Sequence, residues 1–288
     1  MEDTVAAEWW CGAAVAVAAG AACWLVASQP SDDAAGAVAA RLQANLPAGS
    51  PLLYRREWGG SSPAPQRGRR LRLLQFNTLA DGLCGADIDG PLGGFDSVPP
   101  GALNWEYRKA RLLEELMRHG ELPDIIAMQE VDHFYDWFEP ELEKLGYSGT
   151  FLKKRHSACL RTAPGSGLED GAAIFLRRDA VEAIEPSEQM AYEKLAVDGT
   201  PTGQKANQVA LLATVRLKGG GGKAPSEAFV VACTHLAAAK TAEGERTRAQ
   251  QVAQLVGRLG LLGLPVREQR LLYSSTFCTS NTSNTNIS

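Results

Sequence analysis

The stretch PDIIAMQEVD, residues 123–132, decides the fold. Pro123 ends the element before it, the run 124–129 is short and apolar, and Glu130 closes that run. A short apolar run between a turn residue and a charged residue is typical of a buried strand. We therefore predict a buried strand that ends in a carboxylate.

The residues before this strand predict a helix and a second strand. LRLLQF (71–76) is another short apolar run and ends at Asn77, and residues 78–103 read as a long loop. Asn104 is placed to cap a helix over 105–119, whose leucines recur at the i, i+3, i+4 spacing of one helix face. The order is strand, helix, strand, with polar residues at both strand ends.

The residues after it continue the mixture of strands and helices. Apolar periodicity predicts helices over 133–145 and 243–259, and strands over 147–153, 171–177, 207–217 and 228–236. Glycines at 219–222 separate the last two strands into a hairpin. Strands mixed with helices and hairpins indicate an α+β sandwich rather than a doubly wound parallel sheet.

The two ends of the chain differ from this core. Residues 1–50 form an extension, predicted to be disordered or helical, and residues 51–70 form a flexible linker rich in Pro, Gly, Ser and Arg. Residues 9–27 carry no charge and are long enough to span a bilayer, but Ala and Gly favour insertion less than Leu or Ile. Residues 267–288 form a polar tail with little to bury.

Charge and cysteine usage exclude some classes of protein. A net charge of -4 argues against a strongly basic nucleic-acid coat protein, but leaves a metal-assisted phosphate-ester enzyme open. The six cysteines show no C-x-x-C spacing, and the four histidines are scattered, which argues against a zinc module. We expect a cytoplasmic chain with reduced thiols. The alternatives are an organelle, or weak membrane association through residues 9–27 with the catalytic domain in the cytosol.

Three predicted strands end in a polar residue that suits phosphate chemistry. Asn77 follows LLQF, Glu130 follows IIAMQ, and His235 follows VVACT. A carboxylate binds Mg²⁺, an amide orients a ligand, and a histidine donates to a phosphoryl oxygen as charge develops. Taken singly, each residue has an ordinary alternative: a turn residue, an exposed loop acid and a hydrogen-bonded structural histidine.

Several motifs together resemble one known family. NWEYRKARLLEEL followed by PDIIAMQEVDHF, and then DGAAIF, KANQVA and CTHL, occur in the order seen in the nocturnin and deadenylase branch of the endonuclease/exonuclease/phosphatase (DNase I-like) superfamily. The resemblance covers residues 71–266. It implies the four-layer α/β/β/α sandwich of that superfamily.

The resemblance also implies roles for the strand-end residues. Glu130 is similar to the glutamate that binds Mg²⁺, with Mn²⁺ as the alternative ion. Asn77 matches the asparagine beside the metal and the scissile phosphate, and His235 resembles the histidine that contacts that phosphate. The implied chemistry is hydrolysis at phosphorus with the metal ion polarising the phosphate.

Substrate contacts are implied for four further residues. Lys205 and Asn207 lie in the stretch that faces substrate in the family, and Arg246 and Arg248 resemble basic residues near the nucleotide. The implied activity is that of a 3′–5′ exoribonuclease on poly(A) at RNA 3′ ends. The alternative substrate is NADP(H), attacked by a 2′-phosphatase, and the sequence does not decide between the two.

Two motifs of the family do not occur in this sequence. Gly-Asp-x-Asn, which activates or orients the water, is absent, and so is Ser-Asp-His. We therefore expect an incomplete sandwich in a chain truncated at its C-terminus, with impaired turnover, because general acid–base groups contribute about 10²–10⁴-fold each. We also expect the missing part to supply the second sheet, which would leave one apolar face exposed. A non-catalytic fragment that binds nucleotide or partner proteins is the third hypothesis.

Overall fold

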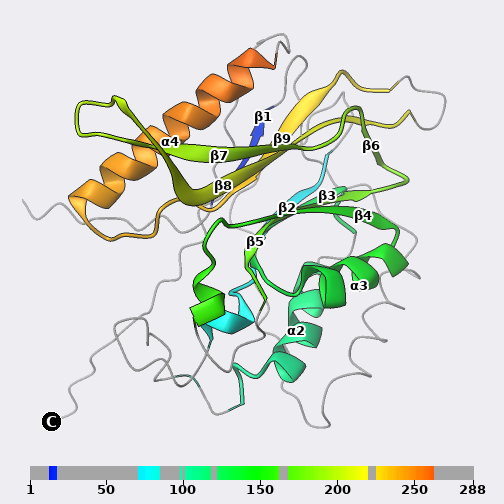
Figure 1. Cartoon of the computed structure of the whole chain (residues 1–288). Coiled ribbons are helices and arrows are strands. Elements are labelled where there is room, and N and C mark those ends of the chain that lie inside the picture. The colour runs from blue at the N-terminus through cyan, green and yellow to red at the C-terminus, as the bar shows by residue number, and fades with distance from the viewer. Residues whose placement is uncertain are drawn as a thin grey trace, which may run out of the picture.

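The fold is a stack of two β-sheets with helices on both outer faces (Figure 1). It comes from a computed structural model that describes residues 13–17, 71–84, 98, 101–117, 122–161, 168–219 and 225–262. The class is α+β, as the pattern of strands and helices predicts, and the layering is α/β/β/α, as the family resemblance implies.

The first sheet has the spatial order β2-β3-β5-β4 and lies over two helices. Its strands are β2 (Leu73–Asn77), β3 (Ile125–Val131), β5 (Gly171–Arg177) and β4 (Tyr147–Lys153). The helices on its outer face are α2 (Trp105–Met117) and α3 (Glu139–Lys144). Strands β2 and β3 are parallel, because α2 connects them as a crossover, and the other pairs are antiparallel.

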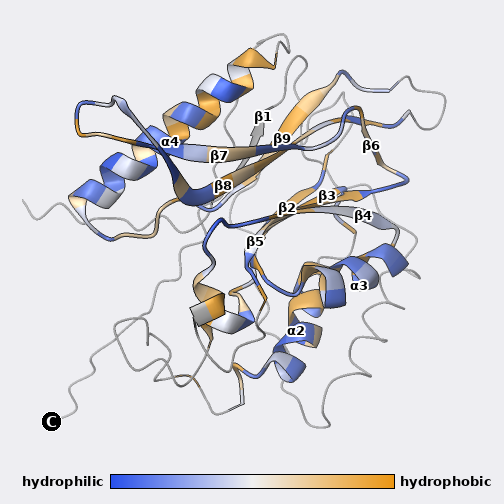
Figure 2. Ribbon diagram, viewed as in Figure 1, coloured by the Kyte–Doolittle hydropathy of each residue, from blue (hydrophilic) through white to orange (hydrophobic). Residues whose placement is uncertain are grey.

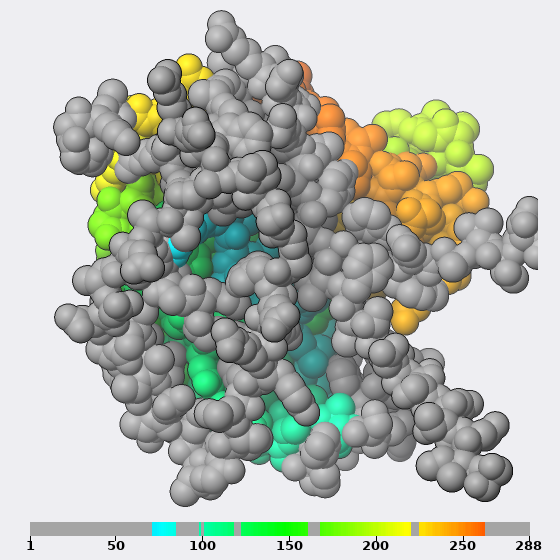
Figure 3. All heavy atoms as spheres, turned by 180° about the vertical axis from the view of Figure 1, so that it is seen from behind, coloured from blue at the N-terminus to red at the C-terminus, as the bar shows by residue number. Residues whose placement is uncertain are grey.

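The second sheet is built around one long strand and is covered by one long helix. Its strands are β6 (Val181–Ala183), β7 (Glu188–Leu195), β8 (Pro201–Leu217) and β9 (Phe229–Thr234), with β1 (Ala13–Val17) on the outer edge of β9. Strand β8 pairs antiparallel with β6, β7 and β9. Helix α4 (Ala242–Leu261) lies beside β7 and β8, as the orange and yellow-green atoms in Figure 3 show.

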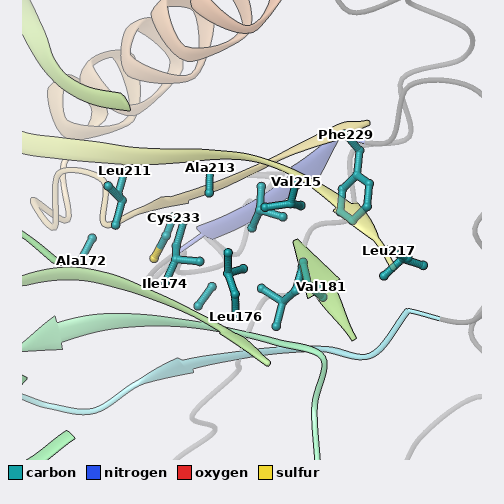
Figure 4. Packing of buried hydrophobic residues seen from close by; sticks show 13 residues of the cluster. Ala172, Ile174, Leu176, Val181, Leu211, Ala213, Val215, Leu217, Phe229 and Cys233 are labelled. Atoms are coloured by element: carbon teal, nitrogen blue, oxygen red, sulfur yellow. The ribbon is translucent and has the colours of Figure 1, made fainter. Parts of the chain in front are cut away.

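The expectation that the chain lacks its second sheet is wrong. Both sheets are present, and their inner faces bury each other. Figure 4 shows Ile174 and Leu176 of the first sheet pointing towards Ala213, Val215 and their neighbours in the second. The apolar face that would have been exposed is therefore the centre of the molecule, because residues 181–217 supply β6, β7 and a long β8.

Two further cores join each sheet to its helices. On the first sheet, Met128 and Phe175 pack with Leu116 of α2 and Leu142 of α3. On the second, Leu212 and its neighbours pack with Leu255 and Leu259 of α4. The helices therefore mix hydrophobic and hydrophilic residues, as Figure 2 shows, because only one face of each helix is buried.

Most predicted elements are present, with shifted ends. The N–H of Glu106 donates to Oδ1 of Asn104 at 2.9 Å, which confirms the predicted cap of α2. The helix predicted over 133–145 is divided into a π-helical turn, Phe134–Phe138, and α3. Strands β6 and β7 were not predicted, and β8 begins at Pro201 rather than at residue 207.

The predictions for both ends of the chain lie largely outside the described residues. This holds for the linker 51–70, the tail 267–288 and most of the extension 1–50. At Ala13–Val17 the structure has a strand where a disordered or helical segment was predicted. Within the described ranges, no helix is long and apolar enough to cross a membrane.

Candidate active site

Three strand ends meet at one end of the sandwich, and each carries one predicted site residue. Asn77 is the last residue of β2 and pairs in register with Gln129 of β3. Glu130 comes next, and its Oε1 lies 3.4 Å from Nδ1 of His235, which directly follows β9 in the facing sheet. The structure therefore brings together three residues that the sequence placed on separate strands.

A β-bulge lies at the metal-ligand candidate. Gln129 pairs with Ala172 of β5 and Val131 pairs with Gly171, so Glu130 is an extra residue in β3. Its φ of +55° lies in the left-handed region, which residues other than glycine rarely adopt. Such a conformation costs on the order of 1–3 kcal/mol, and bulges next to active sites re-aim side chains.

The bulge turns the carboxylate towards the facing sheet. In β3, Ile125 packs between the sheets and Met128 packs on the helix side. Regular alternation would therefore turn Glu130 to the helix side, away from His235. Val131 occupies the helix side instead, because the extra residue has shifted the alternation by one step. The contact between the carboxylate and the imidazole is a product of this bulge.

His235 is a buried neutral histidine with unused hydrogen-bonding capacity. Its side chain is 10% exposed, and within the described part of the chain neither ring nitrogen has a hydrogen-bond partner. Burial lowers the pKa of His235, while the Glu130 carboxylate opposes that shift. A neutral imidazole offers one N–H donor and one acceptor nitrogen, which suits contact with a phosphoryl oxygen.

A lysine and an aspartate near His235 were not among the predicted site residues. The positive charge of Lys154 lowers the pKa of His235, and the negative charge of Asp170 raises it. Nζ of Lys154 pairs with the Asp170 carboxylate, which also accepts from Ser157 Oγ at 2.5 Å. The sequence feature that could have indicated them is their position at strand boundaries, since Lys154 follows β4 and Asp170 precedes β5.

A chain of hydrogen-bonded side chains links β2, β3 and β9 next to the candidate site. Gln75 of β2 donates to Oε1 of Gln129, and Nε2 of Gln129 donates to Sγ of Cys233 in β9 at 3.2 Å. Burial raises the pKa of Cys233 to about 12, so its thiol stays protonated and donates to the carbonyl of Met128. This link crosses the space between the two sheets next to Glu130.

Two predicted substrate-binding residues lie on β8. Lys205 is exposed and pairs in register with Glu193 of β7. Asn207 is half-buried, and its Oδ1 accepts a hydrogen bond from the N–H of His156 at 2.7 Å. Asn207 thus holds the segment that follows Lys154, and substrate contact by either residue stays a prediction.

The two predicted arginines on α4 differ in their surroundings. Arg246 is exposed. Nη1 of Arg248 donates to the carbonyls of Ala237 and Ala239, each at 2.8 Å, and its Nε donates to Glu245. Arg248 therefore fastens the loop that follows His235, and its predicted contact with nucleotide is untested.

The donor set fits magnesium better than zinc. In the described ranges, no three His, Cys, Asp or Glu side chains are grouped to hold a metal ion. Mg²⁺ needs fewer protein ligands, because it keeps several waters and is commonly held by one or two carboxylates together with substrate phosphate. Glu130 offers such a carboxylate. On the neighbouring strand, the side chain of Asn77 is held in place because its Oδ1 accepts from the N–H of Leu79 at 2.9 Å.

The residues and the fold have relatives among known proteins. No protein-family model matches the chain. It is similar to nocturnin of Mus musculus, with 36% identity over 190 residues, which are 66% of this chain and 39% of that protein. It is also similar to carbon catabolite repressor protein 4 homolog 1 of Arabidopsis thaliana, with 34% identity over 140 residues, 47% of this chain and 21% of that one.

A solved structure of the human nocturnin catalytic domain with bound sulfate is similar as well. It is 32% identical, with a TM-score of 0.49, over 66% of this chain and 59% of that domain. The chain spans about two fifths of the length of the mouse protein that it matches. Its sequence identity to the nocturnins, with its sandwich fold, shows that the chain belongs to the endonuclease/exonuclease/phosphatase superfamily and is nocturnin-like.

Proposed function

We propose that the chain carries the metal- and phosphate-binding part of a Mg²⁺-dependent phosphoric-ester hydrolase that acts on the 3′ end of poly(A). The observation that carries the proposal is the approach of Glu130 Oε1 to Nδ1 of His235, at 3.4 Å. A carboxylate and a neutral imidazole thus approach each other, and the positive charge of Lys154 acts on the same imidazole.

Each of these residues has a separate task in the proposed reaction. Bound Mg²⁺ supplies electrostatic stabilisation of the phosphate and of the leaving group. Glu130 would hold the ion, and the amide of Asn77 would hydrogen-bond the phosphate or orient a ligand of the metal. His235 donates its one N–H to a phosphoryl oxygen, and Lys154 attracts the negative charge of the substrate.

The proton acceptor for the attacking water is the part that the sequence does not supply. Neither Gly-Asp-x-Asn nor Ser-Asp-His occurs in the chain, and a general base contributes about 10²–10⁴-fold. We therefore propose that binding of metal and nucleotide is retained and that turnover is slow.

Binding and turnover are best tested separately on the full chain. With Mg²⁺, we expect adenosine oligonucleotide to bind, and Glu130→Gln to weaken that binding about tenfold or more, because the carboxylate ligand is lost. Glu185→Gln removes an exposed carboxylate of β6–β7 and serves as the charge-matched control. Equal, metal-independent binding by all three proteins would contradict the proposal.

The turnover arm distinguishes the substrates. Poly(A) shortening and phosphate release from NADP are measured with Mg²⁺ and with Mn²⁺, in wild type and in Glu130→Gln. Slow shortening that depends on Glu130 supports the exoribonuclease, and phosphate release from NADP supports the 2′-phosphatase instead. Binding without either product assigns the chain as a nucleotide-binding fragment.

A further inference from the structure

The strained backbone at Glu130 needs a partner that holds it. A left-handed glutamate persists only where surrounding contacts over-determine the conformation. Two peptide planes flank the Cα of residue 130: one carries the carbonyl of Gln129, and the other carries the carbonyl of Glu130 itself. If both planes are fixed, φ and ψ of the residue are fixed with them.

A single residue holds both planes. The N–H of Thr78 donates to the Gln129 carbonyl at 3.0 Å. Its hydroxyl lies 2.8 Å from the Glu130 carbonyl and 3.1 Å from that of Gln129. Thr78 is 3% exposed, so little water competes for these bonds. It directly follows Asn77, which places its backbone alongside the end of β3.

Thr78 is itself held by helix α2. Nη2 of Arg108 donates to the Thr78 carbonyl at 2.8 Å and also to the Leu79 carbonyl. Leu79 has a φ of +54°, so the turn after β2 is as unusual as the bulge in β3. Two strained backbones thus lie side by side, and the buried guanidinium of Arg108 braces the turn that carries Thr78.

We propose that Thr78 is a positioning residue of the site: its hydroxyl holds the bulge that aims the Glu130 carboxylate at His235. The consequence for metal binding rests on the proposed function. Without the hydroxyl, residue 130 relaxes towards the extended backbone that a non-glycine residue prefers, and regular alternation turns its side chain to the helix side.

The test compares three variants with the wild-type full chain. Thr78→Val keeps the shape and removes the hydroxyl, whereas Thr78→Ser keeps the hydroxyl and removes a methyl group. Tyr147→Phe is the matched control, because Tyr147 also donates a buried hydroxyl to a carbonyl, that of Pro123 at 2.6 Å, before the opposite end of β3. Thr78→Val and Tyr147→Phe should both lower the melting temperature by a few degrees.

Two readouts separate positioning from mere stability. NMR backbone shifts of residue 130 should leave the left-handed range in Thr78→Val and stay in it in Thr78→Ser and Tyr147→Phe. Mg²⁺ affinity should fall about 10–100-fold in Thr78→Val, stay near wild type in Thr78→Ser, and be unchanged in Tyr147→Phe. If Thr78→Val does not fold, Thr78→Ala removes the same hydroxyl with less bulk.

The possible outcomes test the positioning role of Thr78 separately from the proposed Mg²⁺-dependent function. A left-handed residue 130 in Thr78→Val, or an unchanged Mg²⁺ affinity beside a lowered melting temperature, overturns the positioning role. If wild type binds no Mg²⁺, the proposed function fails, and the backbone shifts of residue 130 still decide whether Thr78 holds the bulge.

Discussion

At the scale of single residues, His235 gives the site a dependence on pH. Burial lowers its pKa from the ordinary 6.5, against the opposing effect of Glu130. Between the ordinary and the lowered value, the unfolded chain binds a proton that the folded chain does not. The free energy of unfolding therefore falls as the pH drops below about 6.5, and this loss ends below the lowered pKa, where both states bind the proton.

Replacing His235 should remove that loss. Between about pH 7.5 and about pH 5.5, we expect the free energy of unfolding to fall more for wild type than for His235→Gln, because glutamine does not titrate. Urea unfolding of both proteins at the two pH values measures the difference. Equal losses would mean that the imidazole is not kept neutral by its surroundings.

At the scale of elements, we expect replacement by alanine to change the free energy of unfolding in opposite directions at two glycines. A Cβ on Gly171, which pairs with the bulge at the start of β5, would lie 2.1 Å from the Leu152 carbonyl oxygen. On Gly257, an exposed residue of α4, a Cβ would meet nothing within 4 Å. Close packing of strands makes the first substitution costly, and helix propensity favours the second.

We expect Gly171→Ala to lower the free energy of unfolding by about 1–3 kcal/mol. Gly257→Ala should raise it by about 0.5–1 kcal/mol, because alanine restricts the unfolded chain and suits the helix interior. Chemical unfolding of both variants beside wild type measures the two signs. A neutral Gly171→Ala would show that β4 and β5 are not packed as described at this point.

The sequence predicts elements well where apolar runs are continuous. β3, β5 and β9 are buried over nearly their whole length, so their composition alone marks them. β7 reads EQMAYEKL and was missed, because one face is polar and only residues such as Tyr192 point into the core. Its partner β8 was predicted six residues short for the same reason, since its first part is exposed.

The site is predictable in part. Strand ends identified Asn77, Glu130 and His235, but neither sequence nor periodicity indicated the bulge, because glutamate has no preference for a left-handed backbone. Lys154 and Asp170 were missed because their electrostatic effect on His235 depends on how the two sheets face each other. That relation is a property of tertiary packing and leaves no local mark in the sequence.

At the scale of the whole molecule, the two sheets form one body through the core between them. Leu211 is fully buried there and packs with residues of both sheets. We expect Leu211→Ala to lower the free energy of unfolding by about 2–5 kcal/mol, because a cavity remains where the sheets meet. Fluorescence and circular dichroism should report one coincident transition in urea, since both sheets lose the same support.

The control is an apolar residue outside any core. Val197, in the turn between β7 and β8, is 92% exposed, so Val197→Ala should change the free energy of unfolding by less than about 0.5 kcal/mol. Two separate transitions in wild type, or a Leu211→Ala variant as stable as Val197→Ala, would contradict the one-body fold.

Because Glu130 is an extra residue in β3, deleting that one residue would remove the site without breaking the strand. Deleting the codon for Glu130 would leave a strand that still pairs with β5. The deletion would, however, remove the bulge and the carboxylate that it carries. Such a protein would fold and be inert. A single-codon deletion is therefore a short route to a folded protein without the metal ligand, and an alignment gap at this codon would mark it.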